Sequence, residues 1–529
     1  MRRLRCGPKS VSTKEEMTDA RATPPAVSPS GAMWEQLFHR SSKPGLSLQG
    51  QIREMMVSAI LTGVLTPGDP VPSSRELARH LGVGRITVVL AYQQLTEESF
   101  LVSHQRKGHF IHPDVLQGRT PQAPPAPDAD GEESAVTPAD WGQRLWLRPS
   151  EQRSIVKNEN WQSFPYPFLY GQFDKDLFPT AAWRECCIKA LSVLDIHQWA
   201  PDLITRDDDS LIHQIQTKIL PRRGVWASPD EIIITVGAQH ALYMVGDLLL
   251  RDDSSVGMED PGYPDARNIF SSRTSQLKFL PVDGSGLPLS GELCDLDYLY
   301  VTPSHQCPTG VTMPLERRHA LLNMAQEEDF ILIEDDYESE SSFDDQPIPA
   351  LKSLDRSNRV IYIGSLSKSM APGLRVGYIV AAPELLQELR ALRRLMIRHP
   401  STFIQRTLAM FISLGHYESQ LRKLGAAQKE RHAALVAAMA EHLPECRITP
   451  VRGGGSCWVQ LPDHVSAREL AVVAAEHGVL VEPGDIFFQS PVAPGNFVRL
   501  GYQSIPTSKI AQGVQALAEA MRGIGRPAA

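Results

Sequence analysis

Three short polar segments carry the side chains most suited to chemistry, and each one follows an apolar run. The segments are Gly237-Ala238-Gln239 after EIIITV, Asp335-Asp336-Tyr337 within FILIEDDY, and Ser365-Leu366-Ser367-Lys368 after VIYIG. Arg375 lies seven residues beyond Lys368. Together they supply a primary amine, carboxylates, hydroxyls, a guanidinium and the backbone amides of a helix start. An amine condenses with an aldehyde, whereas the last three kinds of group bind phosphate.

Pyridoxal phosphate requires this set of groups. Its aldehyde condenses with a lysine, its pyridine nitrogen stays protonated opposite a carboxylate, and its phosphate binds amides, hydroxyls and a guanidinium. Two other interpretations stay open at this point. Ser365-x-x-Lys368 also matches the SxxK motif of penicillin-binding proteins, although the chain contains no KTG or SDN. Asp335 and Asp336 could instead bind a metal ion or cap a helix, but we expect no metal site.

The elements that position these segments form an alternating pattern from about residue 160 onward. Short runs that are apolar on both faces are typical of central strands in a mostly parallel sheet. We expect such strands at residues 231–236, 299–303, 330–336, 360–365 and 376–380. Ligands bind beyond the carboxyl ends of such strands, where the polar segments lie. The last ~130 residues predict a smaller α+β domain, with a helix over 426–443 and strands over 456–461 and 497–502.

The N-terminal region has a different pattern. Apolar residues at helical spacing predict a helix over 48–65, namely Ile52, Met55, Met56, Ala59 and Ile60. A second helix starts at Ser73, with Glu76 completing a capping box, and Gly82 ends it. A third helix begins near Gly84-Arg85, and two short strands follow, FLVSH and GHFIH. This order of elements predicts a winged helix-turn-helix.

Composition limits the remaining possibilities. The chain has 529 residues and a net charge of −8, so any contact with nucleic acid must come from a local patch. Seven cysteines without a CxxC spacing argue against a disulfide framework or structural zinc and favour the cytoplasm. We expect a multidomain chain with four parts, namely a disordered extension 1–32, a DNA-binding domain 33–112, a Pro/Ala/acidic linker 113–159 and a body 160–529, with a small subdomain over about 400–529.

The segment PSSRELARHLGVGRITVVLAYQQL resembles the GntR family of bacterial winged-helix regulators. The resemblance implies that Arg75, Arg85 and Thr87 contact double-stranded DNA, and Arg106 and Lys107 of the wing could touch phosphates. The alternative is that these cations only solvate the domain surface. Residues 31–112 hold eight Lys or Arg and six Asp or Glu, a balance of only +2. The motif therefore supports DNA binding more strongly than the charge does.

Residues 160–525 resemble fold-type-I aminotransferases through SLSKSMAPGLRVGY, FILIEDDYESE, TPSHQCPTG, EDPGYP and VRLGY. The resemblance implies that Lys368 is the reactive Schiff-base lysine, which is the catalytic position of the family. It further implies that Asp335 pairs with the pyridine nitrogen, that Tyr337 lies near the phenolic oxygen, and that Tyr263 stacks on the ring. The phosphate would be held by Ser365, Ser367, Arg375 and the amides of Ala238 and Gln239. Arg499 would bind an amino-acid carboxylate.

Two departures from that family weaken the case for ordinary transamination. Cys307 stands where an asparagine that hydrogen-bonds the phenolic oxygen is typical. Three aspartates, residues 207–209, replace the usual tyrosine and glycine, and we interpret them as a solvated helix start. We also interpret the arginine run Arg390, Arg393, Arg394 and Arg398 as a solvated helix face, with a secondary DNA contact as the alternative.

The combination of a GntR-like head, a linker and a fold-type-I body resembles MocR/GabR-type transcription regulators. The resemblance implies a cytoplasmic homodimer that binds an operator and senses an amino compound through aldimine exchange at Lys368. Two alternatives stay open. The chain could be an active aminotransferase with a fused DNA-binding module, or a regulator that senses pyridoxal phosphate itself.

Overall fold

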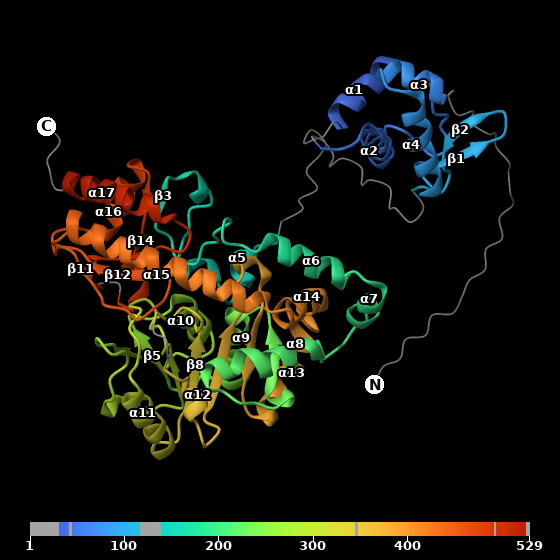
Figure 1. Ribbon diagram of the computed structural model, residues 1–529. Coiled ribbons are helices and arrows are strands. Elements are labelled where there is room, and N and C mark those ends of the chain that lie inside the picture. Colours follow the sequence, from blue (N-terminus) through green and yellow to red (C-terminus); the bar gives the residue numbers. More distant parts are fainter. Residues whose placement is uncertain (1–30, 42–44, 117–138, 344–347, 491–492, 525–529) are drawn as a thin grey trace. The chain divides into compact units, whose positions relative to one another are not determined.

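The computed structural model describes residues 31–41, 45–116, 139–343, 348–490 and 493–524. The chain divides into two units, one ending at Ala139 and the other beginning at Asp140, and each is described by itself (Figure 1). Within the described residues, no helix combines the length and the apolar character needed to cross a membrane.

The smaller unit is a winged helix-turn-helix, as the sequence predicts. Its helices are α1 (Gly31–Ser41), α2 (Leu48–Leu61), α3 (Ser74–Leu81) and α4 (Arg85–Glu97), and its wing is the antiparallel pair β1 (Leu101–His104) and β2 (Gly108–Ile111). All five apolar residues predicted to line α2 are buried. Ser73 caps α3 by accepting a 3.3 Å hydrogen bond from the Glu76 amide. Gly82 ends α3 with φ +63°, which glycine adopts without strain.

The larger unit is built on a seven-stranded sheet. In spatial order its strands are β4 (Ile232–Thr235), β10 (Gly377–Val380), β9 (Val360–Ser365), β8 (Ile331–Asp336), β7 (Tyr298–Val301), β5 (Val256–Asp260) and β6 (Leu277–Pro281). Only β10 runs antiparallel to its neighbours, so the predicted mostly parallel sheet is confirmed.

Both faces of this sheet are buried, which explains its continuous apolar strands. Alternate residues enter two different cores, since Ile361 and Ile363 of β9 pack in one and Tyr362 packs in the other. The helices that surround the sheet are α6 (Thr180–Ala190), α7 (Val193–Trp199), α8 (Asp209–Gln214), α9 (Gly237–Leu249), α10 (Pro264–Ser271), α11 (Leu315–Glu327), α12 (Leu351–Leu354), α13 (Pro383–Ile397) and α14 (Thr402–Ser413).

The C-terminal part of the larger unit has its own core, as predicted for an α+β domain. Its sheet has the order β11 (Arg447–Ile448), β12 (Ser456–Gln460), β15 (Phe497–Gly501) and β14 (Glu482–Pro483). Its helices are α15 (His416–His442), α16 (Ala467–Glu476) and α17 (Thr507–Gly523). The first segment of the larger unit, which begins with α5 (Trp141–Arg144), joins this part through β3 (Tyr166–Pro167), which pairs with β13 (Val479–Leu480).

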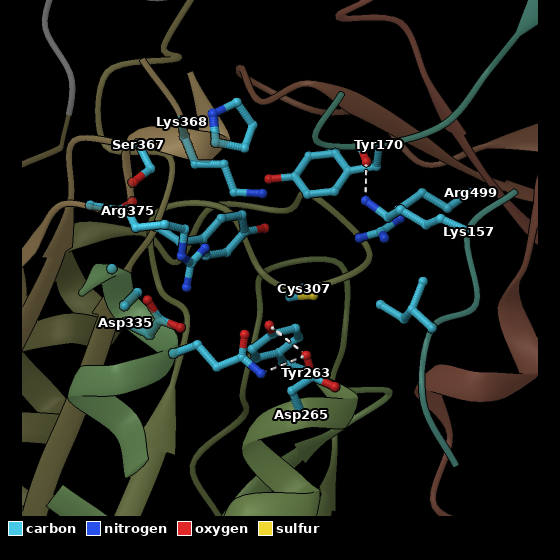
Figure 2. A pocket seen from close by; sticks show the side chains of 17 residues that line it. Lys157, Tyr170, Tyr263, Asp265, Cys307, Asp335, Ser367, Lys368, Arg375 and Arg499 are labelled. Atoms are coloured by element: carbon cyan, nitrogen blue, oxygen red, sulfur yellow. Dashed lines mark hydrogen bonds between the residues drawn. The ribbon is translucent and has the colours of Figure 1, made fainter. Parts of the chain in front are cut away.

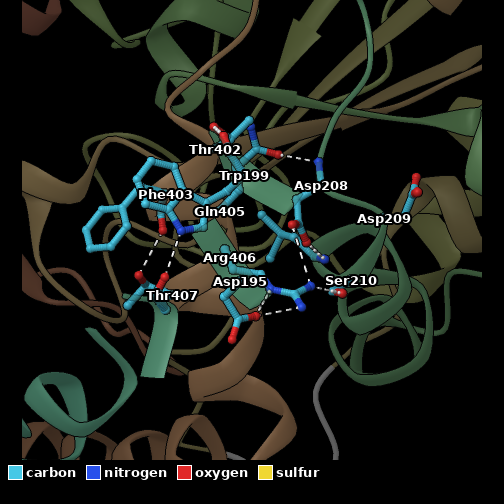
Figure 3. Close-up of polar contacts among 12 residues, drawn as sticks. Asp195, Trp199, Asp208, Asp209, Ser210, Thr402, Phe403, Gln405, Arg406 and Thr407 are labelled. Carbon is cyan, nitrogen blue, oxygen red and sulfur yellow. Dashed lines mark hydrogen bonds and ion pairs between the residues drawn. The ribbon is translucent and has the colours of Figure 1, made fainter. Parts of the chain in front are cut away.

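The acidic run does begin a helix, but it is not solvated as the sequence analysis expects (Figure 3). Asp208 is buried, and it caps α8 by accepting a 2.9 Å bond from the Leu211 amide. Its own amide donates to Gln405, and Arg406 lies 3.8 Å from its carboxylate. Of the three aspartates, only Asp209 is exposed. The run therefore anchors α8 against α14 rather than facing water.

The arginine run on α13 is also partly buried. Arg393 is fully buried and lies 2.7 Å from the carboxylate of Asp207, which is buried as well. Arg394 and Arg398 are exposed, as the sequence analysis expects. The interpretation of the run as a solvated face is therefore wrong at Arg393, whose charge pairs with the acidic run inside the protein.

Candidate functional site

One cavity of about 230 Å³ lies at the carboxyl ends of β8 and β9, beside the start of α9. It brings together every residue that the sequence analysis assigned to the cofactor and ligand (Figure 2). These are Lys368, Asp335, Tyr337, Tyr263, Ala238, Gln239, Ser365, Ser367, Arg375, Cys307 and Arg499. They come from segments up to about 260 residues apart, so the fold rather than local sequence assembles the site.

Lys368 follows β9 and extends into the cavity. Its ammonium lies 4.4 Å from the centre of the Tyr170 ring. Burial lowers the pKa of Lys368 to about 8, although the Glu338 carboxylate opposes this shift. The lowered pKa increases the neutral, nucleophilic fraction of this amine near neutral pH. Gly171 leaves space for it, because a Cβ there would lie 2.8 Å from the Lys368 Nζ.

Asp335, near the end of β8, is almost fully buried. Its Oδ2 accepts a 2.9 Å bond from the Tyr300 hydroxyl. Within the described residues its Oδ1 is buried and has no hydrogen-bond partner. Burial raises the pKa of Asp335 to about 7. A buried carboxyl with an unused oxygen is suited to pair with a protonated nitrogen of a bound molecule.

The part of the cavity beside the start of α9 is suited to binding an anion. The backbone amides of Ala238 and Gln239 lie in the first turn of α9, where amides lack partners within the helix. Arg375 sits beside them, and its Nη2 donates to the Val236 carbonyl at 3.3 Å. A Cβ on Gly237 would lie 3.1 Å from that Nη2, so the glycine permits the close approach.

The Ser367 hydroxyl already has hydrogen-bond partners within the protein. It accepts from the Val376 amide at 2.9 Å and lies 3.2 Å from the Val376 carbonyl, to which it donates. These bonds hold the loop between β9 and β10. Contact of Ser367 with a phosphate therefore stays a prediction, as it does for Ser365.

Two aromatic residues and Cys307 form the middle of the cavity. Tyr263 precedes α10, and its hydroxyl donates to Asp265 at 3.1 Å. The Cys307 side chain is buried, and burial raises the pKa of its thiol to about 12. The thiol is therefore protonated at neutral pH and is a weak hydrogen-bond donor. Tyr337 packs in the same apolar cluster as Cys307.

The predicted role of Arg499, binding a carboxylate of a ligand, would suggest a guanidinium without a partner in the protein. Arg499 instead forms an ion pair with Glu482. Its Nε and Nη2 both donate at 2.7 Å to one oxygen of Glu482, and both side chains are buried. Its guanidinium carbon lies 4.3 Å from the Tyr170 ring centre and 4.6 Å from that of Phe487. The pair forms because β14 and β15 place Glu482 directly opposite Arg499.

The sequence analysis missed four residues that line the cavity, Ile155, Lys157, Tyr170 and Asp265, and it missed Glu482, which pairs with Arg499. The first two lie in the segment before β3, which has no periodic pattern that would assign them to a site. The ammonium of Lys157 donates to the Tyr170 carbonyl at 2.6 Å. Glu482 could have been found only from the strand pairing that places it beside Arg499.

The predicted DNA contacts are distributed over three elements of the smaller unit. Arg75 is exposed in the first turn of α3, and Arg85 is exposed at the first position of α4. Thr87 is half-buried on α4, and Arg106 and Lys107 are exposed in the turn between β1 and β2. The first turn of a recognition helix and the tip of a wing are surfaces that reach DNA. No group of three or more His, Cys, Asp or Glu residues in the described part of the chain could hold a metal ion.

Comparison with known proteins identifies both units. Residues 202–517 match the family of aminotransferases of class I and II, and residues 48–111 match bacterial regulatory proteins of the gntR family. The chain is 40% identical to the HTH-type transcriptional regulator TauR of Rhodobacter capsulatus, over 90% of this chain and 97% of TauR. It is 30% identical to the probable rhizopine catabolism regulatory protein MocR of Rhizobium meliloti, over 89% and 93%.

Among solved structures, the larger unit is similar to the alpha-aminoadipate aminotransferase LysN of Thermus thermophilus. That crystal structure contains N-(5'-phosphopyridoxyl)-L-leucine. The TM-score is 0.66 at 29% identity, and the match covers 73% of this chain and 99% of LysN. Because the relatives above match over nearly their whole lengths, the comparison includes both units and their order. The chain therefore belongs to the MocR/GabR type of transcription regulators, in which a GntR-family winged helix-turn-helix is joined to an aminotransferase-like body.

Proposed function

We propose that this regulator binds pyridoxal phosphate in the cavity around Lys368 and senses an amino compound there. The observation that carries the proposal is the presence in one cavity of a buried amine, a buried carboxyl and a cationic anion site, on Lys368, Asp335 and Arg375. The phosphopyridoxyl compound in LysN supports the cofactor class. In the cytoplasm, binding of an amino compound in this cavity would then change how the protein binds its operator.

The residues present fit the cofactor. The unused Oδ1 of Asp335 suits its pyridine nitrogen, and the first turn of α9 with Arg375 suits its phosphate. Tyr263 lines the same cavity and offers a ring for stacking. When bound, the cofactor supplies an aldehyde that condenses with primary amines.

The protein side of sensing then depends on Lys368. Its amine would compete with an incoming amine for the aldehyde of the cofactor, and its lowered pKa favours the neutral, nucleophilic form that this reaction needs. A signal requires that the two forms of the pocket favour different conformations of the chain, because a ligand shifts only an equilibrium between states that it binds unequally. We also propose that the chain acts as a homodimer, and the exposed apolar side chains Ile188 on α6 and Leu194 on α7 support this.

We expect the purified chain to take up pyridoxal phosphate and to show a visible absorbance band that borohydride abolishes. The physical reason is that a reducible carbon–nitrogen double bond forms at the Lys368 amine. Absorbance scans before and after reduction measure this, and peptide mass spectrometry locates the reduced adduct. A protein that stays colourless with added cofactor, or an adduct on another lysine, would contradict the proposal.

We expect Arg85→Ala to weaken operator binding by about 1–3 kcal/mol, since the guanidinium at the start of α4 reaches either a base edge or a phosphate. Loss of a base contact relaxes specificity at one position, whereas loss of a phosphate contact weakens all sequences alike. Gel shifts on specific and scrambled DNA distinguish the two. Arg522→Ala, at an exposed position in α17, is the control and should bind like the parent. Unchanged affinity of Arg85→Ala for both DNAs would remove Arg85 from the interface.

A further inference from the structure

Helix α4 of the smaller unit presents an apolar outer face to solvent. Ile86 is 76% exposed, the highest value for any large apolar side chain in the described part of this unit. Leu90, one turn further along α4, is 46% exposed, and Val89 beside it is 42% exposed. The outer face of a surface helix is usually polar, and an exposed apolar patch is typical of a binding surface.

The packing of α4 fixes the direction of this face. The residues that α4 buries in the core of the unit are Val88, Ala91, Tyr92 and Leu95. On one flank, the Tyr92 hydroxyl donates a 2.9 Å bond to the Pro72 carbonyl, just before α3. On the other flank, Gln94 accepts a 3.2 Å bond from α2. Ile86 lies between these flanks on the side away from the core, so its side chain is accessible to a large partner.

The charges along α4 indicate which end approaches DNA. Arg85 directly precedes Ile86, and Arg75 is exposed in the first turn of α3. Within the described residues of this unit, neither arginine has a recorded ion pair. At the other end of α4, Glu97 is exposed, and its recorded hydrogen bond comes from a neutral amide. Phosphates attract cations and repel carboxylates, so the half of α4 with Ile86 and Leu90 is the half that enters a groove.

The chemistry of the two aliphatic side chains selects what they can contact there. Neither Ile86 nor Leu90 can form hydrogen bonds to base edges, but apolar side chains contact the methyl group that thymine displays in the major groove. The two residues are four positions apart, which is about 6 Å along the helix axis. Successive base pairs are about 3.4 Å apart, so a helix that follows the groove brings them to methyl groups about two base pairs apart.

We propose that Ile86, together with Leu90, reads thymine methyl groups in the major groove of the operator. The two side chains thereby select A·T base pairs by apolar contact, while the cations Arg75 and Arg85 beside them bind the DNA through charge and hydrogen bonds. The inference rests on the match to the gntR family and does not depend on the sensing proposed for the cavity. Ile86 is thus a specificity-determining residue of the DNA-binding unit.

The test uses the full chain, without any amino compound, and a duplex that the parent selects from a random DNA library. Each thymine of this duplex is replaced in turn by uracil, which keeps the hydrogen-bonding groups of the base pair and lacks only the methyl group. Fluorescence anisotropy at one salt concentration measures the affinity. Ile86→Ala removes most of the apolar contact, and Ile86→Val keeps most of it. The matched control is Val64→Ala, at an exposed position between α2 and α3.

In the parent, uracil should weaken binding about three- to fivefold at one or more thymines, the value of removing one methyl group from an apolar contact. In Ile86→Ala the effect of uracil at one such thymine should disappear, whereas Ile86→Val and Val64→Ala should keep it. A uracil effect of unchanged size in Ile86→Ala would assign the methyl group to another residue and overturn the proposal. A parent that is insensitive to every uracil, or that selects no sequence, would overturn it as well.

Size-exclusion chromatography of the same variants tests a different occupant of the patch. Because Ile86 is exposed, Ile86→Ala should elute and unfold like the parent. A variant that changes its oligomeric state while it binds every duplex like the parent would make the patch a contact between copies of the chain, and the proposal would fail.

Discussion

Lys368→Ala should bind its operator with near-parental affinity and no longer respond to the sensed compound. The substitution removes the one amine that an incoming amine must displace, whereas Asp335, Arg375 and the first turn of α9 still offer contacts to the cofactor. Operator binding should persist because Lys368 lies in the larger unit, and the predicted DNA contacts all lie in the smaller one. The expected effect is complete loss of regulation with little loss of DNA affinity.

A promoter–reporter measured with and without the compound tests the response, and gel shifts test the affinity. Lys218→Ala is the matched control, since Lys218 is an exposed lysine of the same unit that lies outside the cavity. It should bind and respond like the parent. A Lys368→Ala protein that still responds would show that the lysine is not the switch. A parent that converts amino acids to keto acids at about 1 s⁻¹ or faster would favour the aminotransferase alternative.

Much of the fold follows from local patterns in the sequence. The strands β8 and β9 are predictable because buried parallel strands are apolar on both faces, and the helix-turn-helix is predictable because Ser73 and Gly82 mark the ends of α3. The three polar segments with Ala238, Asp335 and Lys368 are predictable because strand ends of one sheet meet at one edge. The other cavity residues were assigned only through the resemblance to aminotransferases.

The other end of the cavity is not predictable in this way. Lys157 reaches it from an irregular segment, and Glu482 meets Arg499 only through the pairing of β14 with β15. Each depends on a contact between distant parts of the chain. No local periodicity encodes such contacts, so a single sequence identifies Arg499 by its motif but not the residues that set its charge.

The same reason explains the wrong interpretation of the charged runs. A cluster of aspartates and a cluster of arginines each look solvated when considered alone, because unpaired charges are costly to bury. Asp207 and Arg393 are 186 residues apart in the chain and bury each other's charge. Arg393 also donates to the carbonyls of Ile234 and Thr205, and Asp207 accepts from the Ile234 amide. The pair therefore holds β4 and α13 together.

Arg393→Met should lower the free energy of unfolding of the larger unit by about 3–5 kcal/mol, which is the usual cost of breaking a buried ion pair from one side. The loss is large because the Asp207 carboxylate stays buried without its cation, and because two backbone carbonyls lose a donor. Urea unfolding of the full chain, followed by circular dichroism, measures the change in the transition of the larger unit. A cost of that size is a sizeable part of the ~5–15 kcal/mol that stabilises a typical domain.

Arg394→Met on the same helix is the matched control. Arg394 is exposed, so its replacement should change stability by no more than about 0.5 kcal/mol. The double variant Asp207→Asn with Arg393→Met should cost less than the sum of the two single changes, because the second change removes the charge that the first one leaves unpaired. If Arg393→Met and Arg394→Met have the same free energy of unfolding, the buried ion pair does not stabilise the packing of α13 against β4. Additive single effects would likewise show that the two side chains act independently.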